Sequence, residues 1–419
     1  KGEPFKEEIA KKIMSPGLYP ILFSKREITR ETFNSPTFKG TWFNCNPEAD
    51  SHRKKIDLCF PCFKADGSIG GLNYRYWKED ESKCSSRLLT GSEHSESVWH
   101  SNIPEKIDRI VITESEFDCM AHYQLNPEKN ANTLYISHQG NLIPSQIDCV
   151  MGIMRNNIDK LSPDFKFVLG ADNDDAGSRY DLQIIKKIAE QKKDTLSLDM
   201  PIHPTGPSNN TNSKDIMMGD WIDESGILTT ITVTASKYDK FKDLTKLYLE
   251  DSHIPSINVR FIDDHNTVQV LRTKNDKSTN TALSELILNS DLLIRNVRRE
   301  KPIEKDWNDD LKMLNKINNV VWEHFDIPKR IDYQGYRELA TDYRLHVAAM
   351  EDEKTDESQV PGLKKVNSPE LKKLVKEYMN TRPELFKEVP QLVKELEERN
   401  QVSPEMEEKL RQAKAMFRR

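Results

Sequence analysis

Acidic residues that follow two apolar stretches are the part of the sequence best suited to chemistry. Glu114 follows Arg109-Ile-Val-Ile-Thr113, and Asp172 and Asp174 follow Phe165-Lys-Phe-Val-Leu-Gly-Ala171. Both stretches predict buried strands, and Asp172 and Asp174 can face the same way because they are two apart on an extended segment. Carboxylates held close together need a cation, and carboxylate oxygens are ligands that Mg²⁺ and Mn²⁺ prefer. These residues therefore predict a Mg²⁺ or Mn²⁺ site.

The second acidic segment also has a purely structural interpretation. Acidic residues after a strand often cap the next helix, and Asp175-Ala-Gly177 could do only that. For Asp172 and Asp174 alone, capping is the better interpretation. Glu114, at the matching end of another predicted strand, reverses the preference, because the carboxyl ends of strands in an open α/β sheet line the functional crevice.

Three predicted strand–helix units position these residues. The alternation begins at Lys106 and predicts an open parallel sheet covered by helices. The predicted strands are 109–113, 133–137 and 165–171, and the predicted helices are 116–124, 144–156 and 176–192.

The cysteines allow two interpretations. Cys59-Phe-Pro-Cys62 has zinc-knuckle spacing, and Cys45 and Cys84 could complete four thiolates. The pair lies in an apolar run that leads to the turn Asp66-Gly67, which predicts a strand entering a hairpin. Because there is no second C-x-x-C, we favour buried strand thiols, and the zinc alternative stays open.

The composition bounds the class of protein. The 419 residues are 31% charged with a formal net charge of −6, which excludes a protein that coats a polyanion with its whole surface. Apolar runs stay well below the ~18 residues of a membrane span, and the charged start, Lys1 to Lys12, lacks the apolar core of a signal peptide. The missing initiator Met indicates a trimmed chain. We expect a cytoplasmic protein of several domains without a membrane partner.

The acidic segments resemble the Toprim domain, which bacterial primases, type IA and type II topoisomerases and some nucleases share. The resemblance is carried by Ile112-Thr-Glu-Ser-Glu-Phe-Asp118 and Asp172-Asn-Asp-Asp-Ala-Gly177. Lys305-Asp-Trp-Asn-Asp309 is similar to the third motif of Toprim proteins encoded by plasmids and conjugative elements. Ser137-His-Gln-Gly-Asn141 and Gln146 also resemble the stretch after the second Toprim strand.

The preceding region resembles the N-terminal half of the polymerase domain of replicative primases. In that half a glycine-rich hairpin ends in Arg, and a basic segment leads into the Toprim strand. The similar residues here run from Phe63 to Arg75, from Arg87 to Glu93 and from Val98 to His100. The likeness covers about residues 37–195 and 298–312. The primase zinc ribbon is absent, and no G-x-x-x-x-G-K-[ST] of a fused helicase occurs.

The third motif departs from the family, in which it follows the second motif by a few dozen residues. Either residues 203–295 are an insertion, or Asp215 rather than Asp306 belongs to the third motif. We favour the insertion, because Trp307 and Asn308 match the motif and the residues after Asp215 do not.

The resemblance and the predicted elements together imply a mixed α/β protein. The expected parts are an α+β primase-like subdomain (1–105), a Toprim Rossmann-like parallel sheet (106–202 and 296–330), an α/β insertion (203–295) and a helical C-terminal region (331–419) with an acidic linker near 351–362.

The resemblance implies a primase-like nucleotidyltransferase that makes short primers on single-stranded DNA from nucleoside triphosphates by two-metal phosphoryl transfer. It implies that Glu114, Asp172 and Asp174 are catalytic and bind Mg²⁺ or Mn²⁺ together with Asp306. Asp118 would support the site. The residues expected to contact template or triphosphate are Arg75, Lys83, Arg87 and Lys305.

Two other functions stay open. A Toprim nuclease would use the same acidic residues to direct water at a phosphodiester. A degenerate Toprim scaffold would only dock other proteins. For this docking module and for the primase alike, the helical tail is a candidate binding segment for a helicase or relaxase. A topoisomerase is disfavoured, because nothing marks a nucleophilic Tyr.

Overall fold

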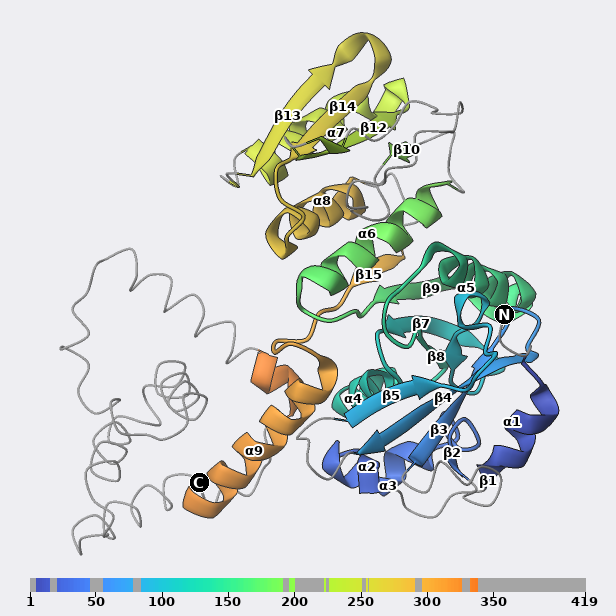
Figure 1. Cartoon of the computed structure of the whole chain (residues 1–419). Coiled ribbons are helices and arrows are strands. Elements are labelled where there is room, and N and C mark those ends of the chain that lie inside the picture. The colour runs from blue at the N-terminus through green and yellow to red at the C-terminus, as the bar shows by residue number, and fades with distance from the viewer. Residues whose placement is uncertain are drawn as a thin grey trace, which may run out of the picture. The chain divides into compact units, whose positions relative to one another are not determined.

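The computed structural model contains three β-sheets within the part of the chain that it describes (Figure 1). The chain divides into two compact units, Lys1–Asn308 and Asp309–Arg419. Among the described helices, none combines the length and apolarity needed to cross a membrane. The residues described are 5–15, 21–45, 56–77, 84–190, 196–199, 222–223, 226–250, 254, 256–290, 296–325 and 332–337.

The N-terminal sheet is antiparallel and has the strand order β1-β2-β3-β4-β5. The turn of its β3–β4 hairpin forms because Asp66 accepts hydrogen bonds from the backbone and hydroxyl of Ser68, at 2.9 and 2.6 Å, and because Gly67 adopts a φ of +85°. The hairpin predicted around Asp66-Gly67 is confirmed. The elements are α1 (Glu7–Ile13), β1 (Met14–Ser15), α2 (Ile21–Lys25), α3 (Arg30–Phe33), β2 (Phe43–Cys45), β3 (Ile56–Phe63), β4 (Ile69–Trp77) and β5 (Cys84–Leu88).

The two cysteines of the C-x-x-C pair lie on β3, and both are buried. Cys59 packs in an apolar cluster with Leu72 and Tyr74, whereas Cys62 donates a hydrogen bond to Gln139 Oε1 at 2.9 Å. Residues three apart on a strand point to opposite faces, so these thiols do not converge. The prediction of buried strand thiols is confirmed. The side chain of Cys84 lies outside the described residues.

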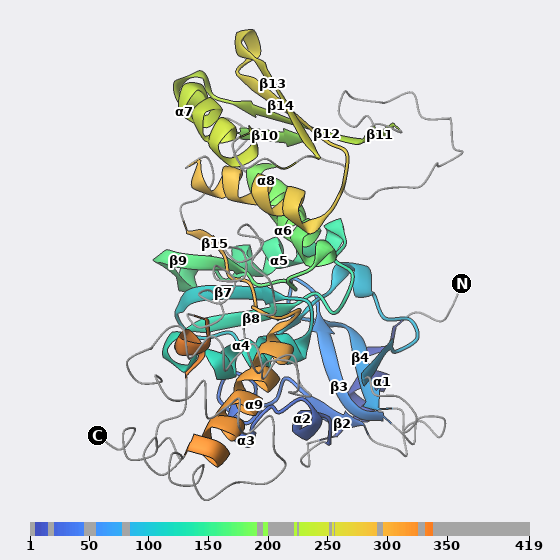
Figure 2. The same ribbon diagram turned by 90° about the vertical axis from the view of Figure 1, so that its left-hand side faces the viewer.

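The central sheet has the strand order β15-β9-β7-β8-β6. Strands β15, β9, β7 and β8 are parallel, and β6 pairs antiparallel with β8. Residues 110–113 of β7 are all buried, as expected for a strand covered on both faces. Helix α4 lies on one face and helices α5 and α6 on the other (Figures 1 and 2). The elements are β6 (Trp99–His100), β7 (Ile107–Thr113), α4 (Glu116–Leu125), β8 (Thr133–Ser137), α5 (Pro144–Asn156), β9 (Leu161–Leu169), α6 (Asp175–Glu190) and β15 (Val297–Arg299).

The third sheet is antiparallel, with the strand order β10-β12-β14-β13 and a short β11 paired to β12. Along the chain it falls between β9 and β15, two neighbouring strands of the central sheet. The elements are β10 (Leu196–Asp199), β11 (Ile222–Asp223), β12 (Gly226–Val233), α7 (Ala235–Thr245), a π-helix (Lys246–Glu250), β13 (Ile257–Ile262), β14 (Thr267–Arg272) and α8 (Lys277–Asn289). Helix α9 (Trp307–Phe325) follows β15, and the division between the two units falls inside it.

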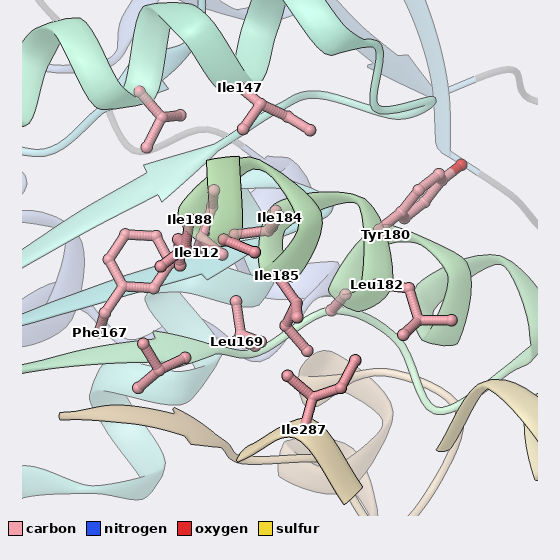
Figure 3. Close-up of a cluster of buried hydrophobic side chains, with 14 of the residues drawn as sticks. Ile112, Ile147, Phe167, Leu169, Tyr180, Leu182, Ile184, Ile185, Ile188 and Ile287 are labelled. Atoms are coloured by element: carbon pink, nitrogen blue, oxygen red, sulfur yellow. The ribbon is translucent and has the colours of Figure 1, made fainter. Parts of the chain in front are cut away.

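A single apolar core joins the central and third sheets. Ile184, Ile185 and Ile188 of α6 are buried in it, and Ile185 lies beside Ile287 of α8 (Figure 3). Apolar residues one, three and four positions apart cover adjoining sides of a helix, so α6 packs against the central sheet and against α8 at once. The mixed α/β class with a parallel sheet is therefore confirmed, and the domain boundaries remain a prediction.

Candidate active site

Glu114 lies directly beyond the carboxyl end of β7. Its backbone carbonyl accepts hydrogen bonds from Gly140 N at 3.0 Å and from Ser137 Oγ at 3.1 Å, which hold it beside the end of β8. Its buried Oε1 has no hydrogen-bond partner among the described residues. Burial, followed by the charges of Asp118 and Asp174, raises the Glu114 pKa to about 8.

Asp172 lies beyond the carboxyl end of β9, the strand next to β7. It is 7% exposed, and within the described part of the chain nothing hydrogen-bonds its Oδ1. Burial and the charges of Glu114 and Asp306 raise the Asp172 pKa to about 8. The charge of Glu114 thus opposes the ionisation of Asp172, as expected for carboxyl groups brought together without a cation.

Asp174 both caps a helix and faces the same side as Asp172. Its Oδ1 accepts a hydrogen bond from Gly177 N at 2.9 Å in the first turn of α6. Asp175, the cap expected from the sequence, instead accepts a bond from Lys277 N at 2.7 Å at the start of α8. An acidic residue therefore does cap α6, but it is Asp174 and not Asp175. The other carboxylate oxygen of Asp174, Oδ2, lies 3.7 Å from Lys305 Nζ.

The segment of the third motif runs along the loop that carries Asp172. Asn173 N donates to Lys305 O at 2.7 Å, and the buried indole of Trp307 donates to Gly170 O at 2.7 Å. The Lys305 ammonium lies 3.9 Å from Asp172 Oδ2, and its side chain is 63% exposed. Residues distant in sequence therefore meet at one edge of the central sheet.

Asp118 and Asp306 complete the acidic neighbourhood. Asp118 accepts bonds from Ser115 Oγ at 2.5 Å and from Asn308 N at 3.4 Å, so it joins the start of α4 to the third motif. Burial, then the charges of Asp306 and Asp172, raises the pKa of Asp118. Asp306 is half-buried and acts on both of these carboxyl groups. The Asp215 alternative lies outside the described residues.

Lys301 holds the loop that carries Asp172, and the sequence analysis did not predict this role. Its ammonium donates to Ala171 O at 2.9 Å and Asp172 O at 3.3 Å, and it lies 2.9 Å from Asp181 Oδ2. Gly177 adds to the fit, because a Cβ there would overlap the carbonyl of Asp172. The basic run from Arg298 to Lys301, just before the third motif, was the available signal.

The predicted basic contacts have different surroundings. Arg75 forms a buried ion pair in which its Nη2 lies 2.6 Å from Glu116 Oε2. The other oxygen of Glu116 accepts bonds from Asn73 at 3.0 Å and Gln139 at 2.5 Å, so the carboxylate is fully satisfied. The role of Glu116 was not foreseen, although the residue lies within the first Toprim motif. Arg75 thus ties β4 to α4.

Of the other two predicted contacts near β5 in the sequence, the structure describes Arg87. Arg87 is exposed on that strand, opposite Tyr74 of β4. Lys83 lies outside the described residues. The structure therefore brings Glu114, Asp118, Asp172, Asp174, Lys305 and Asp306 together, and it places Arg75 and Arg87 on the N-terminal sheet.

The donor set fits a hard divalent cation. Two buried carboxylate oxygens, Glu114 Oε1 and Asp172 Oδ1, lack hydrogen bonds within the described ranges, and such groups are costly unless a ligand satisfies them. In the arrangement seen here, no three His, Cys, Asp or Glu side chains of the described residues are grouped closely enough to bind a metal ion. The side chains would have to close around an ion, and Lys305 stands beside two of them.

Residues 111–211 match the family model described as Toprim-like. The chain contains a Toprim-like domain. The match starts in β7, includes Glu114, Asp172 and Asp174, and ends before the third motif. The resemblance predicted from the two acidic segments is confirmed, and a plasmid or mobile-element origin stays a prediction. No curated protein sequence matches the chain.

Solved primase structures are similar to parts of the chain at low identity. The primase fragment of the bacteriophage T7 primase-helicase protein is 16% identical over 38% of this chain and 58% of its own, with a TM-score of 0.25. A DNA primase domain from Pseudomonas aeruginosa is 15% identical over 43% and 55%, with a TM-score of 0.22. The RNA polymerase domain of Mycobacterium tuberculosis primase DnaG is 14% identical over 47% and 65%, with a TM-score of 0.23. Each is matched over less than two thirds of its length.

Proposed function

We propose that this chain is a primase-like nucleotidyltransferase that synthesises short primers on single-stranded DNA. The observation that supports it most is the pair of buried, unsatisfied carboxylate oxygens on Glu114 and Asp172, within the part of the chain that the structure describes, at the carboxyl edge of the Toprim-like sheet. We call this group of residues, Glu114, Asp118, Asp172, Asp174 and Asp306, the acidic edge. Such a group suits phosphoryl transfer, in which positioning and charge neutralisation supply most of the rate enhancement.

In this proposal the acidic residues hold the ions and orient the reacting groups. Glu114, Asp172 and Asp174 would bind Mg²⁺ or Mn²⁺, with Asp306 completing the set. When bound, such ions neutralise phosphate oxygens and favour ionisation of the attacking 3′-hydroxyl. Burial of Asp172 keeps water from competing for its oxygens, and Lys301 fixes the backbone that carries it. Asp118 would keep the third motif in register through Asn308.

The N-terminal sheet would bind the template and the triphosphate. Arg87 is exposed on β5 and is the best-supported contact for a phosphate, together with Lys83 of the same region. Arg75 would contribute at close range from its ion pair with Glu116, and Lys305 from the acidic edge. The glycine-rich hairpin that ends in Arg75 favours a polymerase over a simple hydrolase, because it resembles the hairpin of replicative primases.

The buried position of Arg75 favours a second candidate, a Toprim nuclease. A guanidinium engaged by Glu116 and 13% exposed presents little surface to an incoming triphosphate. Hydrolysis of a phosphodiester needs only the acidic residues, their ions and a water molecule. This candidate keeps the same site and replaces the 3′-hydroxyl by water.

One incubation separates these functions. The full chain is mixed with single-stranded DNA, ribonucleotides or deoxynucleotides, and Mg²⁺ or Mn²⁺, and the products are resolved by length. We expect short oligonucleotides that require nucleotides and template. Shortening of the template without nucleotide consumption would instead establish the nuclease, and a lack of both reactions would favour a docking module.

Arg87→Ala refines the same experiment. It should weaken nucleotide use about tenfold, because one phosphate contact is lost, and it should affect simple hydrolysis less. Arg30→Ala, at an exposed position on α3, is a matched control and should leave both reactions unchanged. A helicase or relaxase partner remains a prediction for residues 331–419, of which only 332–337 lie within the described residues.

A further inference from the structure

The Lys305 side chain lies beside the two carboxylates, those of Asp172 and Asp174, that a bound metal ion would also use. Its Nζ lies 3.9 Å from Asp172 Oδ2 and 3.7 Å from Asp174 Oδ2, so one ammonium serves two carboxylates. These distances are at the outer limit of an ion pair and longer than direct hydrogen bonds, so the contact is electrostatic and readily exchanged. The lysine side chain is 63% exposed and can leave without disturbing the core.

The backbone at this position is held much more firmly than the side chain. Lys305 O accepts a hydrogen bond from Asn173 N at 2.7 Å, within the very loop that carries Asp172 and Asp174. Trp307, two residues later, is anchored to Gly170 O at 2.7 Å. The fixed backbone therefore keeps the Lys305 ammonium close to the two carboxylates, while the exposed side chain can rotate outward.

An independent observation indicates that the acidic residues suit a ligand other than the Lys305 ammonium. The ammonium faces Oδ2 of Asp172, whereas Oδ1 of the same 7%-exposed residue has no hydrogen bond among the described residues. Glu114 Oε1 is in the same condition within that part of the chain. Lys305 thus neutralises part of the charge but satisfies neither buried oxygen, which a divalent cation would do better.

We propose that Lys305 is a built-in competitor of the divalent cation, which holds Asp172 and Asp174 in the metal-free protein and is displaced when the ion binds. This inference rests on the proposed metal site and adds to it a function for the lysine of the third motif. Displacement also frees the ammonium to meet the phosphate groups of an incoming ligand at the same edge. Metal binding and phosphate binding are thereby coupled through one side chain.

The test is a direct measurement of metal affinity without template or nucleotide. The full chain is titrated with Mn²⁺, and the free ion is followed by electron paramagnetic resonance. Lys305→Met removes the charge and keeps most of the apolar side chain, and it should tighten the Mn²⁺ Kd about three- to tenfold, as expected for loss of two long ion pairs made by an exposed lysine. Lys305→Arg keeps the charge and should stay within twofold of the unmodified chain.

Lys106 provides a closely matched control. Its side chain is 62% exposed and its Nζ lies 2.8 Å from Asp108, near the amino end of β7 and away from the acidic edge. Lys106→Met makes the same change in net charge and should leave the Kd within twofold. An unchanged or weaker Mn²⁺ affinity in Lys305→Met, or equal tightening in Lys106→Met, would overturn the competitor role.

Asp172→Asn in the same titration separates this inference from the metal site itself. If Asp172→Asn abolishes Mn²⁺ binding while Lys305→Met has no effect, the site stands and the competitor role fails. If Asp172→Asn binds Mn²⁺ normally, both the proposed site and the inference fail. Circular dichroism of each variant confirms that the fold is retained.

Discussion

Two glutamates only two positions apart show how differently this protein treats a buried carboxylate. Glu116 is fully buried, and Asn73, Arg75 and Gln139 satisfy both of its oxygens. Glu114 keeps a buried oxygen without a hydrogen bond among the described residues, and its pKa is raised to about 8. A satisfied buried charge fixes the position of two elements, whereas an unsatisfied one is held ready for a ligand.

The two glutamates differ because their side chains face different parts of the protein. Glu116 is in the first turn of α4 and faces the N-terminal sheet, which supplies Arg75 as a partner. Glu114 lies at the end of β7 and faces other acidic residues, Asp118 and Asp174. The same motif therefore supplies a structural joint and a candidate catalytic group. Substitutions at the two glutamates and their neighbours should therefore have different effects.

The largest effect is expected at the unsatisfied edge. Asp172→Asn and Asp174→Asn should each lower metal-dependent activity by about 100-fold or more, because an amide removes the charge that holds the ion and keeps the volume. The metal-free proteins should melt no lower than the unmodified chain. Asp164→Asn, at an exposed position of the same strand β9, is the control. Full activity in both variants would refute the metal site.

A substitution in the ion pair of Glu116 and Arg75 should instead lower the stability of the protein. Glu116→Gln leaves the Arg75 guanidinium buried without its counter-charge and should cost about 3 kcal/mol in the free energy of unfolding. Urea unfolding measures it. Glu128→Gln, at an exposed position, should change stability by less than about 0.5 kcal/mol. A loss no larger than that of Glu128→Gln would remove the contrast between the two glutamates.

The extent of the acidic edge is tested at its third motif. Asp306→Ala should lower activity at least about tenfold more than Asp215→Ala, because Asp306 acts on Asp118 and Asp172 at short range. Rates measured side by side decide between the two positions. The reverse ranking would show that Asp215 belongs to the site and that residues 203–295 are no insertion.

The smallest effect is a pH dependence of the metal-free protein. The pKa values of Glu114 and Asp172 rise on folding from 4.5 and 3.8 to about 8, so the native state binds more protons than the unfolded state between about pH 4 and pH 8. Stability must therefore fall as the pH rises through this window, by a few degrees in Tm. Mg²⁺ should flatten the profile. A Tm that rises with pH and depends on Glu114 would contradict the raised pKa values.

The sequence was informative wherever a pattern was local. The apolar stretches before Glu114 and Asp172 predicted two parallel strands, and their shared edge followed from the way parallel strands align. The Asp66-Gly67 hairpin and the buried cysteines were predicted because turn residues and apolar alternation act over a few positions.

The rest depended on partners distant in the chain. The basic run at Lys301 and the motif position of Glu116 do not reveal the roles of these residues, because a buried charge is recognisable only together with the groups that satisfy it. Arg75 was predicted as an open contact from its place after a glycine-rich hairpin, and the ion pair that engages it was not visible in the sequence. Asp174 rather than Asp175 caps α6 because the chain turns one residue earlier than the pattern suggests.

The late return of the chain to the central sheet has a consequence for biosynthesis. Strand β15 and the third motif pair with β9 and its loop only after the whole third sheet has been made. Closing so long a segment is entropically costly and slow, and domains form progressively as the chain leaves the ribosome. A nascent chain that ends before Lys301 therefore has Glu114 and Asp172 but neither the lysines nor Asp306, and it is an acidic, unfinished site. The candidate site is therefore assembled only after the third motif, more than 120 residues beyond Asp172, has been synthesised.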